Sequence, residues 1–102
     1  MELTEWDSGH TVELPLGERL VVSLEGNPTI GYRWEVDAND PAVLQPNGTP
    51  QFAAVGGAGA GRFTLKFTAI RAGQTNLRLL YRRPFEKVAP PAKRFQVSVT
   101  VR

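Results

Sequence analysis

Hydrophobic and polar residues alternate along most of this chain with a period of two. In residues 62–70 the apolar side chains of Phe63, Leu65 and Phe67 are separated by polar ones, and residues 93–101 repeat the pattern. Successive side chains of a β-strand point to opposite faces, so the alternation predicts strands with one buried and one solvated face. No window of useful length repeats at helical spacing, and the pattern therefore predicts an all-β chain.

Turn-forming residues divide this pattern into seven short predicted strands. They are expected at residues 11–16, 19–24, 32–37, 51–55, 62–70, 75–82 and 93–101. Short strands with regular turns are typical of an antiparallel β-sandwich. The 102 residues have the length of one domain, so residues 1–102 are expected to form a single domain. Trp34 and Tyr81 are expected in the core, and Trp6 in an N-terminal extension that packs on a sheet edge.

Three connections of unusual composition are expected at one end of this sandwich, because the connections between up-and-down strands alternate between its two ends. They are the central loop (residues 27–32, Asn-Pro-Thr-Ile-Gly-Tyr), the glycine-rich loop (residues 56–61, Gly-Gly-Ala-Gly-Ala-Gly) and the Arg-Pro loop (residues 83–91, which begins Arg-Pro-Phe). Loops held by a rigid sandwich are a common location of binding function. We therefore expect this end to bind a partner.

Each loop also has an interpretation as a simple connection. In the central loop, the fixed φ of Pro28 and the freedom of Gly31 suit either a stiff binding loop or an ordinary turn. The glycine-rich loop suits either a close backbone approach to a partner or a flexible hairpin tip. It lacks the lysine and the following helix of a phosphate-binding loop. Phe85 suits either an exposed binding residue or an aromatic that folds back over the sandwich.

The composition excludes most catalytic chemistry. The chain has no cysteine, and His10 is its single histidine, so a disulfide, a thiolate metal site and a cysteine nucleophile are excluded and a histidine-based site is disfavoured. We expect no enzyme activity, no catalytic residue, no metal and no cofactor. The first residues show no secretory signal, and no stretch approaches the about 20 apolar residues that cross a bilayer. A membrane partner is therefore not expected.

The net charge of +2 conceals an asymmetry between the two parts of the chain. Residues 1–61 carry nine acidic and two basic residues, whereas residues 62–102 carry one acidic and ten basic residues. Most of these basic residues alternate outward and the aromatic residues inward, so the basic face lacks the exposed aromatics that stack on bases. We expect no nucleic-acid partner, and we expect the basic part to steer the approach to an acidic protein surface.

The three loops, in this order, resemble those of chagasin-type inhibitors of cysteine peptidases. The motifs are Asn-Pro-Thr-x-Gly-aromatic at residues 27–32, a glycine-rich stretch at 56–61 and Arg-Pro-aromatic at 83–85. The resemblance covers most of the chain. It implies an immunoglobulin-like β-sandwich that inhibits papain-like cysteine peptidases, such as papain or a cathepsin, reversibly and without covalent chemistry. The three loops would enter the active-site cleft, and the inhibitor is expected to act as a monomer.

The resemblance also implies which residues bind the peptidase. They are Asn27, Pro28, Thr29, Ile30, Gly31, Tyr32, Gly57, Ala58, Gly59, Ala60, Gly61, Arg83, Pro84 and Phe85. Thr29 would lie beside the catalytic cysteine and histidine of the target. Ile30 stands where the family usually has a second threonine, Gly57-Ala58-Gly59-Ala60 lacks the last glycine of the family's Gly-x-Gly-Gly, and Phe85 stands where tryptophan is common.

Two questions stay open at the level of the sequence. The same loops would also suit a non-inhibitory immunoglobulin-like binding or adhesion module. Bacterial relatives usually carry an export signal, which this chain does not show, so periplasmic, secreted and cytoplasmic locations all remain open.

Overall fold

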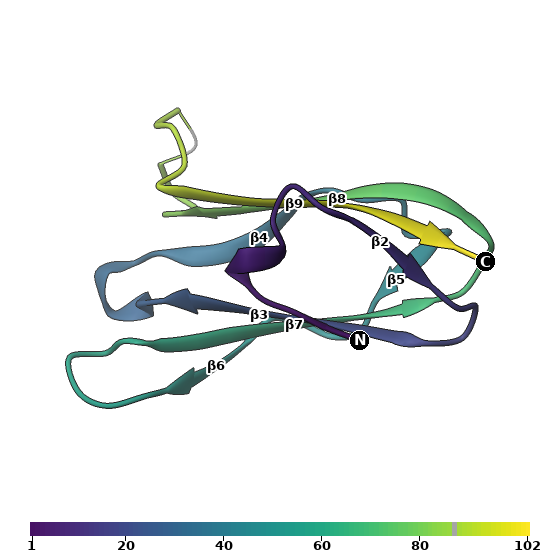
Figure 1. Ribbon diagram of the computed structural model, residues 1–102. Coiled ribbons are helices and arrows are strands. Elements are labelled where there is room, and N and C mark those ends of the chain that lie inside the picture. Colours follow the sequence, from purple (N-terminus) through teal and green to yellow (C-terminus); the bar gives the residue numbers. More distant parts are fainter. Residues whose placement is uncertain (87) are drawn as a thin grey trace.

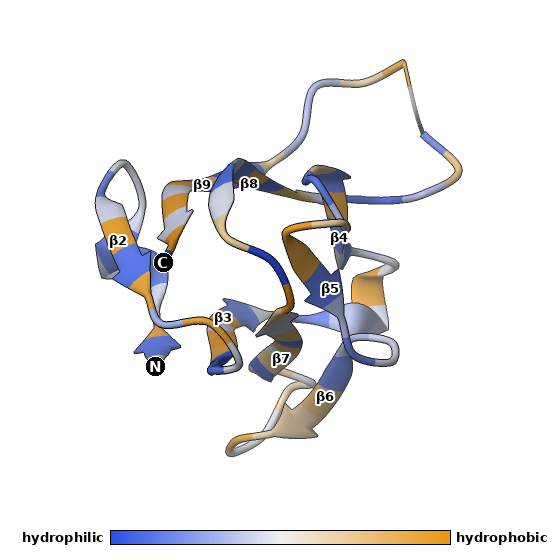
Figure 2. Cartoon of the chain, turned by 90° about the vertical axis from the view of Figure 1, so that its right-hand side faces the viewer, coloured by the Kyte–Doolittle hydropathy of each residue, from blue (hydrophilic) through white to orange (hydrophobic). Residues whose placement is uncertain are grey.

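The computed structural model describes residues 1–86 and 88–102, which form two β-sheets packed face to face (Figure 1). The strands are β1 (Glu2–Leu3), β2 (Thr11–Leu14), β3 (Arg19–Gly26), β4 (Arg33–Ala38), β5 (Leu44–Pro46), β6 (Gln51–Ala54), β7 (Gly61–Ala69), β8 (Gly73–Arg82) and β9 (Lys93–Val101). One sheet has the order β1-β3-β7-β5, with β6 also paired to β7, and the other has the order β2-β9-β8-β4. Figure 2 looks along the sandwich and separates the two sheets. The predicted all-β sandwich is confirmed.

All seven predicted strands are present, and their ends agree with the prediction to within two residues. The sequence pattern missed β1 and β5, which have two and three residues and are too short to show an alternation. It also missed two short 3-10 helices, η1 (Glu5–Asp7) and η2 (Pro28–Ile30). Among the described residues, no helix has the length and apolar character needed to cross a membrane.

The sandwich is not wholly antiparallel. β1 pairs with β3 and β2 pairs with β9 in parallel, whereas the other paired strands are antiparallel. Both parallel pairs arise because the N-terminal segment adds one short strand to the edge of each sheet in turn. Parallel and antiparallel strands have the same alternation of side chains, so the sequence pattern does not distinguish them.

The core is formed by the inward faces of both sheets. Its largest fully buried side chains are Phe67, Phe95, Leu14, Leu20, Leu24, Leu44, Leu77 and Leu79. Burying each contributes about 1.5–3 kcal/mol to folding. Trp34 and Tyr81 are buried as predicted, but the expectation for Trp6 is wrong. The N-terminal extension packs through Leu3, and Trp6 in η1 is 84% exposed.

Candidate functional site

The three loops singled out in the sequence lie together at one end of the sandwich, on the left in Figure 1. The central loop connects β3 to β4, the glycine-rich loop connects β6 to β7, and the Arg-Pro loop connects β8 to β9. The last of these is described except for residue 87. The contacts among the loops show how this end is built.

The central loop is a closed turn whose geometry follows from its sequence. Asn27 caps η2: its side-chain oxygen accepts the N–H of Thr29 at 3.0 Å and also the hydroxyl of Thr29. Pro28 occupies the first helical position, where no N–H is needed. Gly31 ends the turn in the left-handed conformation, with φ of +88°, and donates its N–H to the carbonyl of Pro28 at 3.0 Å. This leaves Thr29 and Ile30 exposed at the tip.

The glycine-rich loop packs against one side of the central loop. The side-chain amide of Asn27 donates to the carbonyl of Ala58 at 3.0 Å, so one side chain braces both loops. Ala58 is the only non-glycine residue with positive φ among the described residues, at +63°. This conformation costs roughly 1–2 kcal/mol for a residue with a Cβ, which the bond from Asn27 helps to offset.

Gly61 differs from the other predicted residues of the glycine-rich loop. It belongs to β7, is buried, and pairs with Gly26 on one side and Ala54 on the other. A Cβ at Gly61 would lie 2.9 Å from Cα of Ala54 and 2.7 Å from the ring of Phe52. Close strand packing therefore requires glycine here, whereas residues 56–58 are exposed.

The Arg-Pro loop holds the central loop from the opposite side. The guanidinium of Arg83 donates to the carbonyl of Ile30 at 2.9 Å, lies 4.9 Å from the ring centroid of Tyr32 and pairs with Glu86 at 3.2 Å. Arg83 and Pro84 are half-buried, whereas Phe85 is 76% exposed. Phe85 therefore does not fold back over the end of the sandwich.

Tyr81 is predicted from the sequence only as a core residue, but it also supports the central loop. Its hydroxyl accepts the N–H of Asn27 at 2.7 Å, and its ring stacks on Tyr32 with centroids 5.0 Å apart. The signal in the sequence is the residue type. A buried tyrosine hydroxyl needs a hydrogen-bond partner, whereas a buried phenylalanine needs none. Tyr81 thus links the core to the root of the central loop.

Removing the hydroxyl of Tyr81 tests this link. Tyr81→Phe leaves the N–H of Asn27 without its acceptor, and we expect a loss of about 1–2 kcal/mol in the free energy of unfolding, measured by urea denaturation. Tyr32→Phe is the matched control, because the Tyr32 hydroxyl has no hydrogen bond among the residues that the structure describes. Equal stability of the two variants would contradict the assigned role.

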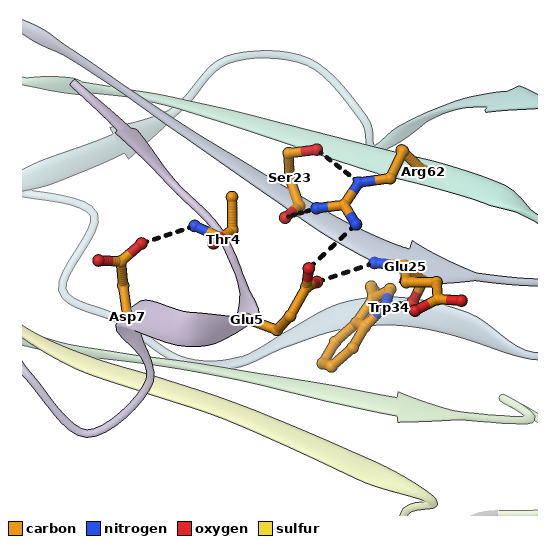
Figure 3. Close-up of polar contacts among 7 residues, drawn as sticks. All are labelled: Thr4, Glu5, Asp7, Ser23, Glu25, Trp34 and Arg62. Atoms are coloured by element: carbon orange, nitrogen blue, oxygen red, sulfur yellow. Dashed lines mark hydrogen bonds and ion pairs between the residues drawn. The ribbon is translucent and has the colours of Figure 1, made fainter. Parts of the chain in front are cut away.

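The roots of the central and glycine-rich loops are also tied to the N-terminal segment (Figure 3). Arg62 donates to the hydroxyl and carbonyl of Ser23 at 3.1 and 2.7 Å and pairs with Glu5 at 3.0 Å. Glu5 also accepts the N–H of Glu25 at 3.2 Å. Burial raises the pKa of the Glu5 carboxyl, but these hydrogen bonds and the charge of Arg62 outweigh burial and hold the pKa below its ordinary value of 4.5. Glu5 is therefore ionised at neutral pH.

The three loops project from the end of the sandwich (Figure 1). A hollow of about 490 Å³, lined in part by Trp34, Val36, Pro50 and Phe63, lies at the side of the sandwich, and no residue of the three loops lines it. In the described part of the chain, no group of three histidine, cysteine, aspartate or glutamate side chains could hold a metal ion. A β-sandwich that presents loops held in this way has the architecture typical of protein-binding modules.

Comparison with known proteins identifies the class more closely. Residues 13–99 match the family described as chagasin family peptidase inhibitor I42, and the chain belongs to this family. Amoebiasin-1 of Entamoeba histolytica is 32% identical over 108 residues, which cover 99% of both chains. The resemblance stated from the loop motifs is confirmed, and the family is one of inhibitors, not of enzymes.

Two solved structures share the fold. The crystal structure of the cysteine protease inhibitor EhICP2 from Entamoeba histolytica has a TM-score of 0.85 and 24% identity, covering 99% of this chain and 93% of that one. The structure of PbICP-C in complex with falcipain-2 has a TM-score of 0.68 and 21% identity, covering 100% and 90%. At these identities the two structures are evidence for the fold.

Proposed function

We propose that this chain is a reversible, non-covalent inhibitor of papain-like cysteine peptidases, which acts as one inhibitor domain spanning residues 1–102. The three loops would enter the active-site cleft of the peptidase together and occlude it. The observation that carries the proposal is the bracing of the central loop from both sides, by Asn27 to Ala58 and by Arg83 to Ile30. Membership of a peptidase-inhibitor family, and the description of EhICP2 as a cysteine protease inhibitor, support the choice of target.

Bracing explains how such a protein would inhibit without being cleaved. A loop that is fixed before binding loses little conformational entropy on association, which favours high affinity. The same rigidity prevents a backbone carbonyl from reaching the distance and alignment that nucleophilic attack requires. In the central loop, the bonds from Thr29 to Asn27 and from Gly31 to Pro28 would supply this rigidity.

The proposed binding residues divide into two groups by exposure. Thr29, Ile30, residues 57–58 and Phe85 are exposed and would contact the peptidase directly. The remaining residues of the proposed site are half-buried or buried and would position those that make contact: Asn27, Pro28, Gly31, Tyr32, Gly59, Ala60, Gly61, Arg83 and Pro84. Ile30, 53% exposed beside Thr29, would add an apolar contact at the tip.

Titration of papain tests the proposal. We expect peptidase activity to fall linearly with added protein and to reach zero near one equivalent, because a standard interface of about 1,600 Å² that is fixed in advance can reach nanomolar affinity. Activity should return on dilution, and mass spectrometry should find the inhibitor uncleaved. Full activity of both papain and a cathepsin at micromolar protein would contradict the proposal and favour a non-inhibitory binding module.

A further inference from the structure

The N-terminal segment crosses the open side of the sandwich, between the two sheets (Figure 1). β1 pairs with β3 in one sheet, β2 pairs with β9 in the other, and η1 lies between them in sequence. The segment is held at both ends of η1: Glu5, its first residue, accepts the N–H of Glu25, and the hydroxyl of Ser8, which follows η1, accepts the N–H of Gln96 at 3.1 Å. The position of η1 is therefore fixed relative to both sheets.

Trp6 is the middle residue of η1, and its side chain is 84% exposed. The residues on either side of it hold the turn in place, since Glu5 pairs with Arg62 and the carboxylate of Asp7 accepts the N–H of Thr4 at 2.8 Å (Figure 3). Tryptophan is strongly enriched among residues that dominate binding, and a fixed backbone lowers the entropy lost when it is covered.

The surface around η1 adjoins the roots of all three loops. Glu25, bonded to Glu5, stands two residues before the central loop, and Arg62, also bonded to Glu5, directly follows the glycine-rich loop. Lys93 and Arg94, which begin β9 after the Arg-Pro loop, share with Glu5 the lining of a hollow of about 90 Å³. The surface around η1 is thus continuous with the strand ends from which the three loops emerge.

The charge of this surface indicates what would cover it. Lys93 and Arg94 are exposed, and neither has a carboxylate partner in the part of the chain that the structure describes. The exposed carboxylate of Glu25 lines the same hollow as Lys93 and Arg94, so this surface carries charges of both signs. An exposed indole on the segment that borders it fits a partner surface that offers an apolar spot among charged side chains.

We propose that Trp6, together with Lys93 and Arg94, forms a second contact with the bound peptidase, on the wall outside the cleft that receives the loops. This inference rests on the proposed function. η1 is bonded through Glu5 to Glu25 and Arg62, which lie next to the central and glycine-rich loops. If the loops enter the cleft along their full length, the outer wall of the cleft would therefore lie beside η1. Trp6 would then be buried on binding without touching the catalytic centre.

Substitution of Trp6 tests the contact through kinetics. We expect Trp6→Ala to raise the inhibition constant for papain about 10- to 30-fold, mainly through faster dissociation, with an unchanged melting temperature. Leu16→Ala is the matched control, because Leu16 is 56% exposed and lies in the turn between β2 and β3, away from the three loops. The inhibition constant of the Leu16→Ala variant should equal that of the wild type. An inhibition constant for Trp6→Ala within twofold of the wild type would overturn the inference and leave the proposed function intact.

A spectroscopic measurement tests burial of Trp6 directly. The chain has two tryptophans, so 5-fluorotryptophan labelling gives two ¹⁹F resonances, and Trp6→Phe assigns them. In the complex with papain, the solvent-isotope shift of the Trp6 resonance should shrink, while that of the buried Trp34 should stay small. A Trp6 resonance that keeps its full solvent-isotope shift in the complex would overturn the inference. A wild-type protein that leaves papain active would overturn the proposed function, and this inference with it.

Discussion

Thr29→Arg should raise the inhibition constant for papain by about 100-fold, which corresponds to about 2.7 kcal/mol of binding free energy. Thr29 is exposed at the tip of the central loop, where the proposed function places it beside the catalytic groups of the target. A long charged side chain at this point would keep the tip from entering the cleft, and its desolvation would be unfavourable. The change also removes the hydroxyl that bonds to Asn27.

The folded protein should tolerate this substitution, because the backbone bonds of the central loop do not involve the side chain of Thr29. We expect the melting temperature to change by less than about 2 °C, as is usual for exposed positions. Thr49→Arg is the matched control: it introduces the same charge at an exposed threonine of the connection between β5 and β6. Equal inhibition by the two variants would show that the tip of the central loop does not enter the cleft. A large drop in melting temperature for Thr29→Arg would instead show that the loop serves stability.

The sandwich and its binding end could be predicted from the sequence because both depend on local patterns. The strict alternation of apolar and polar residues in β7 and β9 predicts these strands. The order of the strands along the chain then predicts that the three loops lie at the same end of the sandwich. The internal geometry of the central loop is also local, since Asn27, Pro28 and Gly31 are a cap, a first-turn proline and a left-handed glycine. Each of these residue types has a specific conformational preference that the sequence displays.

The bracing of the loops could not be predicted, because it joins residues that are far apart in the chain. Arg83 is predicted among the residues that bind the peptidase, and no local signal shows that its guanidinium also contacts Ile30, Tyr32 and Glu86. Tyr81 alternates inward like any core residue, and nothing local shows that its hydroxyl reaches Asn27. The parallel strands and the exposure of Trp6 likewise depend on where the N-terminal segment crosses the sandwich.

The glycine-rich loop gives the second large expected effect, because one of its glycines has no space for a side chain. A Cβ at Gly59 would lie 2.7 Å from Oγ1 of Thr29 and 2.9 Å from Oδ1 of Asn27, at a φ of +77°. Gly59→Ala should therefore push the glycine-rich loop away from the central loop and break the bond from Asn27 to Ala58. We expect the inhibition constant for papain to rise about 100-fold, because the new methyl group displaces the loop. The collision costs a few kcal/mol, and the left-handed conformation of an alanine adds to this cost.

A second alanine variant separates collision from backbone strain. Gly56 also has a positive φ, of +74°, but a Cβ there would meet nothing within 4 Å. Gly56→Ala should therefore bear only the strain, of about 1–2 kcal/mol. This strain is the same in the free and the bound protein, so it lowers the free energy of unfolding and should raise the inhibition constant by less than about tenfold. Loss of the bond from Asn27 is also visible without a peptidase, since the side-chain amide protons of Asn27 should shift in the NMR spectrum of Gly59→Ala and not in that of Gly56→Ala. If both variants inhibit equally, the close packing of Gly59 against Thr29 is not what holds the binding end in its active shape.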